Sequence, residues 1–136
     1  LTQLRNGENK MAQIYLQDKN HSKSFQTIYD DLFYASRFSK SRYGFEFKTL
    51  NTHLKKHYRP TVAYRLNDKK LWRYEFKQNN FQQTKNLLFT QEVAQKELLL
   101  TSIEEFKIFQ NKTKDGFFIF LKMQARTPFY FEISRK

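Results

Sequence analysis

Alternating hydrophobic and polar positions predict a β-hairpin in the middle of the chain, over residues 61–76 (TVAYRLNDKKLWRYEF). Successive side chains of a strand point to opposite faces, so each of the two strands has one apolar face. These faces consist of Val62, Tyr64 and Leu66 on the first strand and of Trp72, Tyr74 and Phe76 on the second. If both faces point into the core, the loop must contain an odd number of residues, about three or five. A two-residue turn at Asp68-Lys69 would instead place Tyr64 opposite Arg73.

A second pattern, with helical spacing, precedes this hairpin. Its apolar stripe consists of Phe25, Ile28, Tyr29 and Leu32. Residues 1–19 are polar with scattered apolar positions and are also predicted to be helical. No proline occurs before Pro60, which favours one continuous helix to about Phe38. The alternative is a break within residues 20–24, where a serine would cap a second helix.

The rest of the chain is predicted to form mainly strands. Residues 87–100 are ambiguous, because a short helix and a strand with a connector both fit their pattern. The segments with strand patterns are residues 43–50, 103–109, 117–122 and 129–134. A helical start followed by strands predicts an α+β fold in a single domain over residues 1–136. The helix is expected over residues 1–38 and a mainly antiparallel sheet over residues 39–136.

Composition narrows the class of protein. The chain has 136 residues, enough for one core, and its 15 Phe and 8 Tyr predict a core built largely from rings. Cysteine is absent, which excludes disulfides and thiolate chemistry. Lys and Arg number 25 against 13 Asp and Glu, giving a formal net charge of +12. Such a charge favours anionic partners: nucleic acid, an anionic membrane surface or an acidic protein.

Catalytic and metal-binding motifs are not evident in the sequence. His21, His53 and His57 lie in no motif, and the spacing of four between the last two is a weak metal signal without a nearby carboxylate or cysteine. The adjacent acids Asp30-Asp31 and Glu104-Glu105 are interpreted as surface residues, because neighbouring side chains point apart. We therefore predict a non-enzymatic protein with no catalytic residue, no metal and no cofactor.

Basic residues interleaved with rings suggest contact with an anion. Basic grooves with stacking rings bind single-stranded nucleic acid, and an ordinary solvated basic surface is the alternative explanation. The candidate anion or nucleic-acid contacts are Arg37, Lys40, Arg42, Lys55, Lys56 and Arg59.

Three stretches resemble a known family. Residues 24–37 (SFQTIYDDLFYASR) are similar to the amphipathic helix of J-type minor pseudopilins of type II secretion and of related minor type IV pilins. Residues 62–76 (VAYRLNDKKLWRYEF) resemble the strand-turn-strand of that family, and residues 98–110 (LLLTSIEEFKIFQ) resemble its next segment. The three stretches occur in the order that the family shows.

The resemblance implies a pilin-like fold, in which a long N-terminal helix lies against an antiparallel sheet. It further implies an upstream hydrophobic anchor, lost before Leu1, that holds the protein at the periplasmic face of the bacterial inner membrane. On this interpretation the core anchors are Phe25, Ile28, Tyr29, Leu32, Tyr64, Leu66, Trp72 and Tyr74, and the subunit-docking residues are Leu4, Met11, Ile14 and Tyr15.

The function that the resemblance implies is assembly. A minor pseudopilin or minor pilin would dock with other minor subunits in a hetero-oligomer, and would prime or cap a type II secretion pseudopilus or a type IV or competence pilus. Its basic charge would pair with acidic minor subunits or, in a pilus for DNA uptake, with phosphates. The alternative is a small basic nucleic-acid-binding domain.

Overall fold

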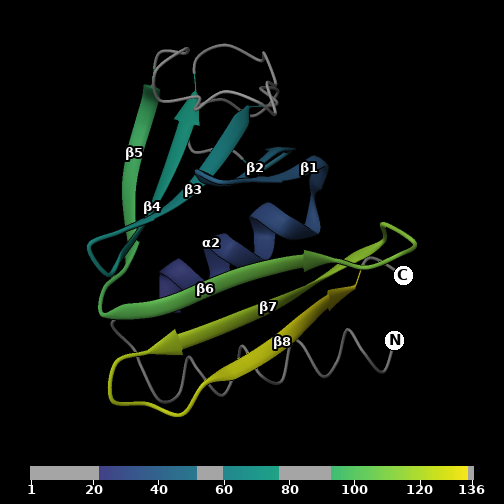
Figure 1. The fold of residues 1–136 in the computed structure, drawn as a ribbon. Coiled ribbons are helices and arrows are strands. Elements are labelled where there is room, and N and C mark those ends of the chain that lie inside the picture. The colour runs from purple at the N-terminus through teal and green to yellow at the C-terminus, as the bar shows by residue number, and fades with distance from the viewer. Residues whose placement is uncertain (1–21, 52–59, 77–92, 135–136) are drawn as a thin grey trace.

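The computed structural model describes residues 22–51, 60–76 and 93–134, which form two antiparallel sheets and one helix. The larger sheet has the strand order β1-β2-β3-β4-β5, and the smaller sheet has the order β6-β7-β8. Helix α2 lies between the two sheets (Figure 1). The elements are α2 (Ser22–Phe33), β1 (Ala35–Ser41), β2 (Gly44–Thr49), β3 (Thr61–Asn67), β4 (Lys70–Phe76), β5 (Val93–Leu100), β6 (Ile103–Gln110), β7 (Gly116–Met123) and β8 (Phe129–Ser134).

The predicted fold class, α+β with a long N-terminal pilin-like helix on an antiparallel sheet, is wrong. Strands make up 64% of the described residues and the helix 13%, so this part of the chain is a mostly antiparallel β structure. The helix does not run to Phe38, because Ala35–Ser41 forms strand β1. The expected helix over residues 1–19 lies outside the described residues.

A side chain from strand β2 closes the end of the helix. Thr49 Oγ1 donates a hydrogen bond to the carbonyl oxygen of Asp31 at 2.9 Å, and this bond is buried. The Tyr34 amide donates to the carbonyl of Asp30 at 3.2 Å. The last carbonyls of a helix have no partner within it. Thr49 supplies such a partner, and the chain passes directly into β1.

The hairpin of β3 and β4 has a different register from the predicted one. Asn67 pairs with Lys70, so the loop is the two-residue turn Asp68-Lys69, whose φ angles of 51° and 60° are both left-handed. Such turns match the twist of the strands that they join. Tyr64 consequently lies opposite Arg73. The predicted loop of odd length is wrong.

Because directly paired residues share a face, this register sends Arg73 and Glu75 to the side of Tyr64, between the sheet and α2. The rings of β4 point to the opposite side. There Phe76 and Ala63 are fully buried, with Tyr74 and Val93 packed against them. The expectation that both apolar faces point into one core therefore fails for β4.

The other strand predictions agree with the structure. Strands β2, β6, β7 and β8 occupy the four segments with strand patterns, and residues 111–115 connect β6 to β7 as a second hairpin. Within the ambiguous stretch of residues 87–100, Val93–Leu100 forms strand β5.

Aromatic rings join the two sheets in the main core. The ring of Phe106 on β6 contacts those of Phe45 and Tyr64 on the larger sheet, each with centroids 5.9 Å apart. Phe38 on β1 meets Phe117 on β7 at 5.1 Å. Edge-to-face ring pairs of this kind add about 0.5–1.5 kcal/mol beyond their buried area. The rings thus hold the sheets together around α2.

Strand β1 forms one edge of the larger sheet and is irregular. Its pairing with β2 shifts register between Ser36 and Ser39, and Arg37 between them has a left-handed φ of 52°. This is a β-bulge, which bends a strand and interrupts its ladder.

Among the residues that the structure describes, no helix is long and apolar enough to cross a lipid bilayer.

Candidate functional site

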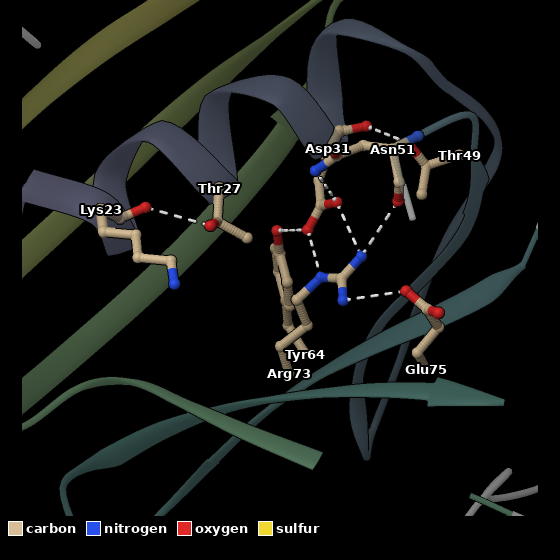
Figure 2. A network of polar contacts seen from close by, with 8 residues as sticks. All are labelled: Lys23, Thr27, Asp31, Thr49, Asn51, Tyr64, Arg73 and Glu75. Carbon is tan, nitrogen blue, oxygen red and sulfur yellow. Dashed lines mark hydrogen bonds and ion pairs between the residues drawn. The ribbon is translucent and has the colours of Figure 1, made fainter. Parts of the chain in front are cut away.

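Charged and hydrogen-bonding side chains form a buried ionic network in the described part of the chain (Figure 2). Arg73 on β4 binds Asp31 on α2 with two donors: Nε lies 2.7 Å from Oδ2, and Nη2 lies 3.0 Å from Oδ1. Arg73 Nη1 also donates to Glu75 Oε1 at 3.1 Å. The exposed fractions of the three side chains are 1% or less. Two-point pairing of this kind has both strength and a fixed geometry.

The remaining partners saturate the Asp31 carboxylate. The Tyr64 hydroxyl donates to Oδ2, and Asn51 Nδ2 donates to Oδ1 at 2.9 Å. Burial, and then the Asp31 charge, raise the pKa of Tyr64 well above its ordinary value. Burial lowers the pKa of Arg73, but the charge and hydrogen bonds of Asp31, together with Tyr64 and Glu75, outweigh it and leave that pKa raised. Arg73 is therefore charged, and Tyr64 is a neutral donor.

This network stabilises the fold and offers no place for a substrate. Each carboxylate oxygen of Asp31 already accepts two hydrogen bonds, from two different residues. The network also joins α2 to β3 and β4, so its role is to hold the helix on the sheet. The interpretation of Asp31 as a surface acid is wrong, because its exposed fraction is 0%. Its position between Ile28 and Leu32, inside the apolar stripe, was the signal for burial.

A second buried ion pair lies on the other face of the larger sheet. Arg65 Nη2 is 2.7 Å from Glu46 Oε1, and the side chains are 7% and 0% exposed. Burial raises the pKa of Glu46 above its ordinary value, against the opposing effect of Arg65. Like the first network, this pair connects neighbouring strands rather than presenting a reactive group.

The outer face of the smaller sheet is different, because it exposes rings. We call Phe109, Phe118, Phe120 and Tyr130 the aromatic face. Phe109 pairs with Phe118 across β6 and β7, and Phe120 pairs with Tyr130 across β7 and β8. Phe109, Phe118 and Tyr130 are 49%, 41% and 67% exposed. Together with Glu105 and Lys107 these residues line a hollow of about 330 Å³.

The charges beside the aromatic face pair with one another. Lys107 Nζ lies 3.5 Å from Glu105 Oε2. Lys122 Nζ lies 3.0 Å from Glu104 Oε2, and hydrogen bonding to Glu104 raises the pKa of Lys122. The face therefore combines apolar rings with two local ion pairs.

A second hollow, of about 300 Å³, lies where the turn between β1 and β2 approaches β6. Two of the predicted anion contacts line it. Lys40 Nζ is 5.8 Å from the ring centroid of Phe109. The Arg42 guanidinium is 4.9 Å from the ring of Tyr43 and donates to its hydroxyl at 2.7 Å. Arg37 is exposed on the bulge of β1 and does not line this hollow.

The other predicted site residues are dispersed or not described. Phe25, Ile28, Leu32 and Tyr64 are buried, and Tyr29 is packed against their cluster. Leu66 is 40% exposed, and Trp72 and Tyr74 are partly buried on the opposite face of the hairpin. The predicted docking residues (Leu4, Met11, Ile14, Tyr15), the anion contacts Lys55, Lys56 and Arg59, and the three histidines lie outside the described residues.

The described ranges thus define a mostly β protein with buried ion pairs and with surface hollows at the aromatic face and at the β1–β2 turn. Within them, no group of three or more His, Cys, Asp or Glu side chains is placed to hold a metal ion. A search of protein families found none that matches this chain, and a search of curated proteins found none similar to it.

Proposed function

We propose that this protein is a non-enzymatic docking subunit of the minor pseudopilin or minor pilin type. It associates with other minor subunits and so primes or caps a type II secretion pseudopilus or a type IV or competence pilus. The observation that carries this proposal is the aromatic face, a set of exposed rings on an otherwise regular sheet.

The composition of the aromatic face suits a protein interface. Interface centres are rich in aromatic residues and poor in unpaired charge. Three of the four rings are 41–67% exposed, and the neighbouring lysines are already paired with glutamates. A partner that covers the rings removes apolar area from water, which contributes a favourable free energy of about 25 cal/mol per Å². Each paired charge keeps its partner when this happens.

The net charge favours a different subunit over a second copy of the same chain. Two chains that each carry a formal charge of +12 repel one another. A partner with acidic net charge would be attracted and oriented by the same field. We therefore assign the partner to an acidic minor subunit.

The resemblance gains physical support from contacts between its three stretches. Asp31, in the first stretch, forms the buried ion pair with Arg73 in the second. Tyr64, also in the second, packs on Phe106 in the third at 5.9 Å. The three stretches therefore lie in contact with one another in the folded protein.

The test is capture of partner subunits from the native host by the tagged protein. We expect Phe118→Ser with Tyr130→Ser to reduce capture of small proteins that begin with a pilin-type hydrophobic segment by roughly tenfold or more, because interface rings carry much of the binding energy. The control is Leu98→Ser on β5, since Leu98 at 42% matches the 41% exposure of Phe118. The proposal would be refuted if the unmodified protein, the double variant and Leu98→Ser captured equal amounts of these partners, provided that thermal unfolding shows all three to be folded.

A further inference from the structure

The second hollow, which we call the turn hollow, differs in charge from the aromatic face. It lies between the turn that joins β1 to β2 and strand β6. Of the residues that the structure describes, Lys40, Arg42 and Lys107 line it and no Asp or Glu does. The rest of its lining is mostly apolar and includes the nearly buried Phe45 and Phe106, each 7% exposed, and Leu66, which is 40% exposed.

Two of the three cations remain available to a ligand. The Lys107 ammonium is engaged by Glu105 at 3.5 Å, so mainly its stem contributes to the hollow. No carboxylate in the described part of the chain lies within ion-pair distance of Lys40 or Arg42, and both contact rings instead. A guanidinium that uses one Nη donor on a hydroxyl still has further N–H groups for an anion.

We propose that the turn hollow binds an acidic peptide segment of the partner subunit, in which a carboxylate stands beside an aliphatic or aromatic side chain. The carboxylate binds Lys40 and Arg42, and the apolar side chain rests on Leu66 above Phe45 and Phe106. This assignment rests on the proposed docking function and adds the chemistry of the partner to it.

A protein segment fits this hollow better than nucleic acid does. Base stacking requires an exposed ring face, whereas Phe45 and Phe106 are each only 7% exposed. Arg42 already lies over the ring of Tyr43. A nucleic-acid strand that continued onto the aromatic face would also bring its phosphates to Glu105, which lines the hollow at that face.

The two hollows share one residue, which supports a single partner for both. Lys107 lines each of them, and Lys40 of the turn hollow lies 5.8 Å from Phe109 of the aromatic face. One acidic subunit would thus place apolar side chains on the aromatic face and a carboxylate in the turn hollow.

The test is an NMR titration of the 136-residue chain with a short acidic probe, the acetylated and amidated peptide EDLFD. We expect saturable shifts of the backbone amides around Lys40, Arg42 and Leu66. The double variant Lys40→Glu with Arg42→Glu should weaken binding roughly tenfold, as reversal of two exposed charges predicts. The control is Lys23→Glu with Lys112→Glu, which makes the same change in net charge at two exposed sites outside the hollow.

The outcomes separate this inference from the proposed function. No shift at millimolar peptide, or equal weakening by both double variants, would overturn the acidic site. The inference would also be overturned if the oligonucleotide dT8 bound more tightly than the peptide and the double variant Lys40→Glu with Arg42→Glu lost that binding. The hollow would then be assigned to nucleic acid. If that variant still captures partner subunits normally while Phe118→Ser with Tyr130→Ser does not, the acidic site fails and the docking function stands.

Discussion

At the scale of the residue, the most consequential group is the carboxylate of Asp31. It accepts hydrogen bonds from Tyr64, Arg73 and Asn51, and its backbone carbonyl accepts one from Thr49. A buried ion pair is weak evidence of net stabilisation against an apolar replacement of both partners. Removal of Asp31 is another matter, because Arg73 would stay buried after losing two of its charge-assisted hydrogen bonds and would keep Glu75 as its ion-pair partner.

Asp31→Ala is therefore expected to destabilise the protein by about 3–5 kcal/mol, since Arg73 would stay charged and buried. The measurement is the free energy of unfolding in urea. Its control is Asp30→Ala, because Asp30 is a partly exposed neighbour whose carboxylate accepts an exposed hydrogen bond from Gln26. That control should lose about 1 kcal/mol or less. Similar losses for the two variants would mean that Asp31 does not hold the network.

Glu46 gives a prediction about pH. In the unfolded chain its pKa is ordinary, about 4.5, whereas burial raises it in the folded protein. Between these two values the folded protein binds more protons than the unfolded chain, so the stability from this group falls as the pH rises. Glu46→Gln does not titrate. We expect the unfolding free energy of the unmodified protein, relative to that of Glu46→Gln, to decrease from pH 4.5 upwards. A difference that stays constant or increases over that range would contradict the raised pKa.

At the scale of the element, the β3–β4 hairpin explains why pattern analysis reached its limit. Alternation located both strands, but it assumed that rings point inward and charges outward. In β4 the reverse holds: Arg73 and Glu75 are buried next to α2, and Trp72 and Tyr74 point away. The partner that makes this register favourable is Asp31, which lies 42 residues from Arg73, so the pattern within the hairpin gives no sign of it.

In the turn of this hairpin, the backbone of Lys69 has a left-handed conformation that a substitution can test. Lys69 has a φ of 60°, a conformation that is disfavoured for residues with a Cβ and free for glycine. Lys69→Gly is expected to raise the free energy of unfolding by about 0.5–1 kcal/mol. Lys70→Gly, one position on and within β4, should lower it by a similar amount, because glycine weakens a strand. Thermal or urea unfolding of both variants measures this, and a loss of stability in Lys69→Gly would exclude the left-handed two-residue turn.

At the scale of the whole molecule, the sequence was a good guide to strands and a poor guide to long-range polar contacts. The strands around Phe106 and Phe131 follow from alternation, because one face of each is buried and the other is not, whereas the strand around Phe117 follows from a nearly continuous apolar run. The end of the helix does not follow from local pattern. Its closing partner, Thr49, comes from 18 residues further along the chain.

The candidate interaction surfaces divide in the same way. Lys40 and Arg42 were expected to meet an anion from charge and neighbouring rings alone, and the fold brings both to one hollow. The aromatic face was missed. Phe118 and Phe120 lie in a nearly continuous apolar run, which does not indicate which of its residues face the solvent.

The bulge in β1 has a consequence for how copies of this protein meet. A straight sheet edge offers a row of free donors and acceptors, and in a chain with 15 Phe such an edge invites fibril growth. The register shift between Ser36 and Ser39 bends β1 and breaks that row. Strand-to-strand polymerisation through this edge is thereby disfavoured, so contact with another copy at β1 would depend on side chains rather than on a continuous backbone ladder.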